Sequence, residues 1–103
     1  MRKITEQACR AFHNNKPFKK NNTEVVIERF ENGDIRSVRM SLFGNVIAIK
    51  YSNDNLIRIC FKGYNTVTTR ERLNGLSNVS FTTKRGKLYM DGNEIDSYKW
   101  YII

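Results

Sequence analysis

Side chains that commonly carry out catalysis are scarce in this sequence. His13 is the only histidine, and its expected place at the C-terminal end of a helix favours a capping or surface role, because a protonated ring interacts well with the helix dipole. Neither Cys9 nor Cys60 has a histidine at motif spacing, and no Cys/His cluster resembles a zinc site. The glycines form neither a dinucleotide fingerprint nor a phosphate loop. We therefore expect a protein that is not an enzyme and that holds no metal or cofactor.

Basic side chains are the stronger signal. The 18 Lys and Arg residues exceed the 10 Asp and Glu residues, which gives a net charge of +8. Grouped cations can follow a nucleic-acid backbone through salt-dependent phosphate contacts, and the alternative is a solvated surface that keeps the protein in solution. The candidate binding residues form three groups: Arg10, Lys16, Lys19 and Lys20 near the N-terminus, Arg70 and Arg72 on an expected helix, and Lys84, Arg85 and Lys87 at a hairpin tip.

Exposed aromatic rings would turn a basic surface into a platform for single strands, because bases stack on such rings in RRM and OB folds. Tyr64 and Trp100 are the two aromatic candidates for such a site. The sequence contains nothing like the paired aromatic motif of an RRM. The alternative is that aromatics at strand parity belong to the core.

The length of 103 residues fits a single domain that spans positions 1–103. No apolar run approaches the roughly 20 residues that a membrane span needs, and the N-terminus lacks the apolar core of a secretory signal. We therefore expect a soluble cytoplasmic protein without a membrane partner. Two cysteines provide no disulfide framework, so we expect Cys9 and Cys60 to be buried thiols.

Two helices are expected. Ile4, Ala8, Ala11 and Phe12 share one side of a helix that runs roughly from Thr5 to Asn14. A second, short helix is predicted around Thr68 and Glu71, whose spacing is that of a capping box, and Gly75 would end it in the left-handed conformation. In this interpretation Glu71 bonds back to the N–H of Thr68, and Arg70 and Arg72 face outward.

The remaining segments are typical of antiparallel strands. Thr23 to Phe30 is followed by the turn dipeptide Asn32-Gly33 and by a strand in which Val38, Met40 and Leu42 alternate with polar residues. The other expected strands are Val46 to Tyr51, Leu56 to Phe61, Val79 to Thr83 and Leu88 to Met90, with Trp100 to Ile103 as an edge strand or lid. Alternate residues of a strand share one face of the sheet, and in two of these strands the alternate residues are large and apolar. The predicted core residues are therefore Ile47, Ile49, Tyr51, Ile57, Ile59 and Phe61. We expect an α+β fold, with the N-terminal helix packed on an antiparallel sheet of about five to six strands and the capped helix before the last hairpin.

Two segments carry a family resemblance. The chain from Phe43 to Ala48 and from Thr66 to Asn74 resembles small accessory proteins of tailed bacteriophages, which pair a Gly-Asn-x-Ile-Ala strand with a Thr-Thr-(Arg/Lys)-x-Arg-Leu-Asn helix. Their following hairpin is loosely matched by Arg85 to Tyr89, whereas the long first hairpin, Thr23 to Leu42, departs from the pattern. The resemblance implies an accessory phage product made in the bacterial cytoplasm, and it assigns no site. Small basic phage proteins of this sort often block a host enzyme or a defence system, in one precedent by RNA-dependent inhibition of a toxin RNase.

These observations favour a non-enzymatic phage-type protein that binds nucleic acid as a counter-defence or host-takeover factor. RNA is favoured over duplex DNA because no expected helix has the character of a groove-reading element. The first alternative is an inhibitor that binds directly to an acidic surface of a host enzyme or toxin, such as a toxin–antitoxin RNase. A weaker alternative is a small nuclease that works without histidine. The sequence leaves open whether copies of the chain form a homo-oligomer.

Overall fold

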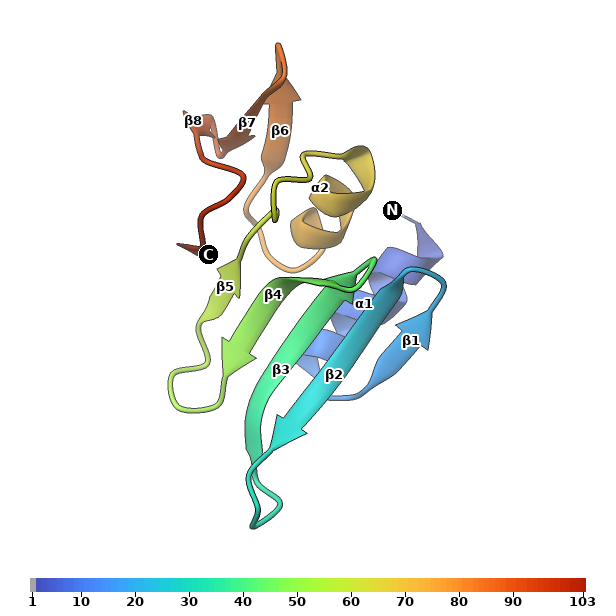
Figure 1. The fold of residues 1–103 in the computed structure, drawn as a ribbon. Coiled ribbons are helices and arrows are strands. Elements are labelled where there is room, and N and C mark those ends of the chain that lie inside the picture. Colours follow the sequence, from blue (N-terminus) through green and yellow to red (C-terminus); the bar gives the residue numbers. More distant parts are fainter. Residues whose placement is uncertain (1) are drawn as a thin grey trace.

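The computed structural model describes residues 2–103 and has an α+β fold, as expected. Its main sheet is antiparallel, with the strand order β1-β2-β3-β4-β5-β9, and a second sheet has the order β6-β7-β8. The elements are α1 (Lys3–His13), β1 (Phe18–Lys20), β2 (Thr23–Arg29), β3 (Ile35–Leu42), β4 (Asn45–Tyr51), β5 (Ile57–Ile59), α2 (Val67–Asn74), β6 (Phe81–Lys84), β7 (Lys87–Met90), β8 (Asn93–Glu94) and β9 (Tyr101–Ile102). Figure 1 shows α1 behind the main sheet, α2 near one end of its strands, and the β6–β8 sheet beyond α2.

Helix α1 covers one face of the main sheet. Ala8 and Phe12 are fully buried, and they pack in one cluster with Val25 of β2 and Met40 of β3. The apolar side of the helix is the one that its sequence spacing predicted, and the helix begins two positions earlier than expected, at Lys3. Burial of this face supplies the stability that an isolated helix of this length lacks in water.

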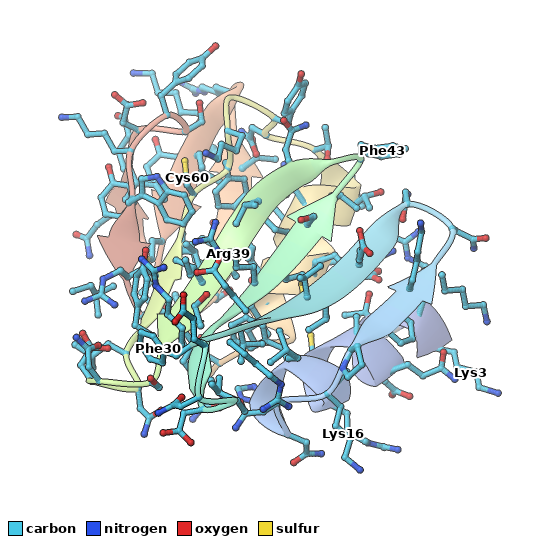
Figure 2. The ribbon with its side chains drawn as sticks, turned by 60° about the horizontal axis from the view of Figure 1, so that its bottom comes forward. Lys3, Lys16, Phe30, Arg39, Phe43 and Cys60 are labelled. Atoms are coloured by element: carbon cyan, nitrogen blue, oxygen red, sulfur yellow. The ribbon has the colours of Figure 1, made fainter. Side chains whose placement is uncertain are left out.

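The other face of the main sheet carries no helix. Successive side chains of a strand point to opposite faces, so the neighbours of the core positions lie on this second face. Figure 2 shows Arg39 over the middle of the sheet. The register aligns one row of residues across five strands on this face: Val26, Arg39, Ile49, Arg58 and Ile102. We call it the open face.

A bulge in β4 makes one sequence prediction partly wrong. Met40 pairs with Ala48 while Ser41 pairs with Val46, so Ile47 is an extra residue in its strand. Ile47 joins the core, but the bulge shifts the parity of the residues that follow it. Ile49 and Tyr51, which were expected in the core, therefore lie on the open face. Ile49 is buried there, as expected, at 7% exposure, whereas Tyr51 is half-buried.

Helix α2 also differs from its prediction. Its N-cap is Thr66, whose hydroxyl accepts a hydrogen bond from the N–H of Thr69 at 3.1 Å, so the expected capping box of Thr68 and Glu71 does not form. Gly75 has a right-handed φ of −74° instead of a left-handed one. It permits close helix packing instead, because an added Cβ would lie 2.8 Å from the sulfur of Cys9.

The C-terminal segment completes the main sheet. Strand β9 pairs antiparallel with β5, through Tyr101 with Ile59 and Ile102 with Arg58, which confirms the expected edge strand. Cys9 and Cys60 are buried free thiols, as predicted. Within residues 2–103, neither helix has the length and apolar character needed to cross a membrane.

Candidate functional site

A hollow of about 500 Å³ lies on the open face of the main sheet. Strands β3, β4 and β5 supply most of its wall, and the segments that follow β5 and precede β9 close one side. Among residues 2–103, no carboxylate lines this hollow. Its lining residues are Arg39, Val46, Ile49, Tyr51, Arg58, Lys62 and Trp100. The hollow therefore combines apolar and aromatic surface with three cationic side chains.

Trp100 and Lys62 form one edge of the hollow. The Lys62 ammonium nitrogen lies 4.9 Å from the centre of the Trp100 ring, a distance at which a cation is attracted to an aromatic face. Trp100 is 43% exposed, so its ring remains accessible to a ligand. Lys62 makes no ion pair with any other residue that the structure describes. Its charge is therefore available to an anionic group bound beside the ring.

Tyr51 and Arg58 form a second pair in the same hollow. The guanidinium carbon of Arg58 lies 5.4 Å from the centre of the Tyr51 ring. Arg58 also donates to the Asp54 carboxylate at 2.7 Å, and this hydrogen bond lowers the pKa of Asp54. Asp54 thus holds Arg58 in place and neutralises part of its charge.

Phe30 and Arg36 extend the site toward the β2–β3 turn. The Arg36 guanidinium carbon lies 5.9 Å from the centre of the half-exposed Phe30 ring. A second hollow, of about 240 Å³, is lined by this pair and by Tyr51, which also lines the first hollow. Phe30 and Arg39 are labelled in Figure 2, which places Phe30 toward the turn end of the sheet. We call the three pairs, Phe30–Arg36, Tyr51–Arg58 and Trp100–Lys62, the aromatic strip.

The charge of the aromatic strip is positive but partly compensated. Glu28 lies 3.3 Å from Arg36 and 3.6 Å from Arg39, measured between nitrogen and oxygen atoms. These ion pairs are largely exposed and therefore weak, so another anion can replace Glu28 at the two arginines at little cost in free energy. Bases can stack on the rings while the cations contact phosphates, which is the chemistry of single-strand binding surfaces.

Only one predicted binding residue, Trp100, lies in the aromatic strip. Arg10, Lys16, Lys19 and Lys20 are exposed on α1, the following loop and β1, and Lys84, Arg85 and Lys87 are exposed at the β6–β7 turn. Figure 1 shows the β6–β7 turn at the end of the molecule that lies away from β1. These two basic groups therefore do not share a surface. Tyr64 is exposed and lines a different hollow.

The two arginines of α2 do not face outward as expected. Arg72 is 1% exposed, and its side chain donates to Thr23 at 3.1 Å and to Glu71 at 3.0 Å, with a further hydrogen bond to Thr5. Arg70 is partly buried and donates to the backbone carbonyl of Asn65 at 3.2 Å. Arg72 is a structural residue, so its prediction as a contact residue is wrong.

Sequence reasoning missed most of the aromatic strip. The alternation of β3 did place Arg39 on a polar face, and the same rule applied to β5 places Arg58 opposite Ile57 and Ile59. Tyr51 was assigned to the core because the bulge at Ile47 has no clear sequence signal. The pairing of Lys62 with Trp100 depends on tertiary structure alone.

His13 lies outside this site. Its Nε2 atom is 2.8 Å from the backbone carbonyl oxygen of Leu76, so the ring ties the end of α1 to the chain that follows α2. Across the described part of the chain, no three His, Cys, Asp or Glu side chains are grouped closely enough to hold a metal ion.

Residues 1–102 match a family model described as Kyanoviridae Gp96 protein. No curated protein and no solved structure matches the chain.

Proposed function

The chain belongs to the Kyanoviridae Gp96 protein family and is a phage accessory protein, and we propose that it binds single-stranded RNA through the aromatic strip on the open face of its main sheet. The observation that carries the proposal is the placement of Lys62 over the exposed ring of Trp100, in a hollow that no described carboxylate lines. In this proposal RNA binding serves counter-defence or host takeover.

The geometry favours a single strand over a duplex. Base stacking on protein rings requires bases that are unstacked from their neighbours, and RNA loops and ends supply such bases. The rings of Phe30, Tyr51 and Trp100 lie along a sheet, whereas duplex readers usually place a helix in the major groove. Neither α1 nor α2 lies on the open face, so no helix contributes to this surface.

Each aromatic ring is held by a cation that a base can displace. When a base stacks on Trp100, the Lys62 ammonium moves from the ring to a phosphate oxygen. The contact between Lys62 and Trp100 is then replaced by two contacts, one between the base and Trp100 and one between Lys62 and the phosphate. The same exchange applies to Arg58 at Tyr51 and to Arg36 at Phe30. Affinity then combines stacking, which tolerates many sequences, with phosphate contacts, which weaken with salt.

The single tryptophan makes this proposal directly testable. Because Trp100 is the only tryptophan, its fluorescence reports contact at the proposed site. Titration of the intact protein with a short unstructured RNA at low salt is expected to quench this fluorescence, and added salt should reverse it. Absence of both quenching and RNA binding at low salt would refute the proposal.

An acidic host protein is the second candidate partner, because the cations of the open face would also accept carboxylates. This candidate predicts a protein that stays bound after nuclease treatment, with Lys62 protected in the complex. Loss of the RNA substrate during the titration would instead indicate the nuclease alternative.

A further inference from the structure

A third hollow, separate from the aromatic strip, lies at the end of the main sheet between the β3–β4 turn and the start of α2. Its volume is about 360 Å³, which is near the lower end of the range for small-ligand sites. Leu42, Ile47 and Phe61 are lining residues that are themselves buried, so they form an apolar floor. No charged residue of the described chain lines this hollow, so it is suited to a neutral group and not to a phosphate.

Two exposed aromatic rings stand at the rim of this hollow. Phe43 is 72% exposed and Tyr64 is 57% exposed, although both line the hollow. Figure 2 shows Phe43 at the tip of the β3–β4 turn, beyond the ends of the strands. The φ of Phe43 is +51°, a conformation that bulky residues seldom adopt. Phe43 and Gly44, whose φ is +82°, form the two-residue turn between β3 and β4, which requires a positive φ at both positions. This turn holds the apolar ring of Phe43 in solvent beside the apolar floor.

Asn45 provides the hydrogen-bonding edge of the hollow. Asn45 lines the hollow and is half-buried, and its side-chain amide takes part in none of the side-chain hydrogen bonds found among residues 2–103. The hydroxyls of Thr66 and Thr69 lie 2.9 Å apart, and the Thr66 oxygen also accepts from the Thr69 N–H, so these two hydroxyls already bond to each other and to the backbone. A free amide presents a donor and an acceptor side by side, which matches the N6 and N7 edge of adenine.

We infer that this hollow holds one unstacked nucleobase, preferably adenine, with its ring against Phe43 and Tyr64 and its edge bonded to Asn45. The aromatic rim and apolar floor favour a flat ring, the absence of charge excludes the phosphate, and the amide selects the base. The inference rests on the proposed function in one respect, because a bound RNA strand is one of the two sources of the base. A free nucleoside is the other source.

The test compares adenosine and uridine with short single-stranded RNAs of repeated A or repeated U. In two-dimensional NMR spectra of the intact protein, adenosine is expected to shift the Asn45 side-chain amide signals more than uridine does. The A strand should bind more tightly than the U strand, by roughly fivefold or more for a two-bond contact to the base. If the A strand shifts the Asn45 signals but free adenosine does not, the hollow takes its base only from an RNA strand.

Variants separate this site from the aromatic strip. Asn45→Leu should remove the preference for A while U-strand binding persists, and Lys62→Glu should weaken both strands while adenosine still shifts Asn45. Equal binding of A and U strands by the unaltered protein, with no shift at Asn45 from any adenine-containing probe, would overturn the inference. An apolar peptide that shifts Asn45 where adenosine and the A strand do not would overturn it as well. If the unaltered protein binds neither strand but adenosine still shifts the Asn45 signals, the proposed function alone is refuted.

Discussion

The ammonium nitrogen of Lys62 lies 4.9 Å from the centre of the Trp100 ring, and this pair joins the chain after β5 to the chain before β9. Both residues lie in short segments beside strands that pair with each other, so the sheet itself sets their separation. The pair places an exposed ring, and a charge that forms no ion pair within residues 2–103, at one edge of the open face.

Replacement of Trp100 by leucine should weaken RNA binding. Loss of one stacked base costs about 1–3 kcal/mol of binding free energy, which is roughly 5- to 150-fold in Kd. Fluorescence anisotropy of labelled RNA measures the effect without tryptophan emission. Tyr98→Leu is the matched control, since Tyr98 is 76% exposed and lies outside the hollow, and its Kd should stay near that of the unaltered protein. Equal losses in the two variants would argue against a defined stacking site.

Charge reversal at Lys62 should change the salt dependence of RNA binding. For single strands, each phosphate contact contributes about 0.7 to the slope of log K against log salt, so Lys62→Glu should reduce the slope by at least that amount. Lys84→Glu makes the same change of charge at the β6–β7 turn, far from the open face, and should reduce the slope by less. If Lys84→Glu reduces the slope more than Lys62→Glu does, the RNA contacts the β6–β7 turn and not the open face.

Truncation of Arg72 should destabilise the fold without changing the proposed RNA-binding surface. Arg72→Ala removes the hydrogen bonds that Arg72 donates to Thr5, Thr23 and Glu71, whereas Glu71 keeps its hydrogen bonds from Thr5 and Arg2. Loss of a buried hydrogen-bond partner costs about 1–3 kcal/mol of unfolding free energy. Arg72→Met keeps most of the volume and should cost less. Urea denaturation measures both. Folded Arg72→Met should bind RNA as the unaltered protein does, and a specific loss of its RNA affinity would contradict the structural role.

The carboxylate of Glu71 should make stability depend on pH in the acid range. Burial alone would raise the pKa of Glu71, but hydrogen bonds from Thr5 and Arg2 and the nearby arginine charges outweigh it and hold this pKa below its ordinary value. A carboxyl with a depressed folded-state pKa adds stability above its unfolded pKa and loses it as pH falls through the folded pKa. Glu71→Gln should therefore flatten the acid limb of a plot of unfolding free energy against pH. Glu94→Gln, in an exposed ion pair on β8, should leave that limb unchanged.

Substitution of Gly75 by alanine should destabilise the contact between α1 and α2. The new Cβ would lie 2.8 Å from the Cys9 sulfur and 3.0 Å from the Thr5 methyl carbon, and overpacking of this kind costs about 1–3 kcal/mol. The φ of −74° suits alanine, so backbone strain does not explain any loss. Cys9→Ala in the same chain should recover part of the stability in thermal denaturation. If Gly75→Ala is at least as stable as the unaltered protein, α1 and α2 can move apart to admit the added methyl group without a loss of stability.

The sequence by itself determined the local features of this protein. The Asn32-Gly33 turn, the alternation of Val38, Met40 and Leu42, and the apolar side of α1 were predicted and are confirmed. Each of these features depends on residues close together in the chain, because turn geometry and side-chain periodicity are local properties. The antiparallel sheet, the helix before the last hairpin and the C-terminal edge strand followed from the same local signals.

Tertiary structure alone decided the composition of the site. Arg72 has a sequence environment typical of a surface arginine, and it is buried because Thr5 and Thr23, which are distant in the chain, satisfy its hydrogen bonds. The bulge at Ile47 arises in the pairing of two strands, and it moves Tyr51 from the expected core to the open face. Burial and register depend on which distant segments meet, and nothing in the immediate neighbours of a residue specifies that meeting.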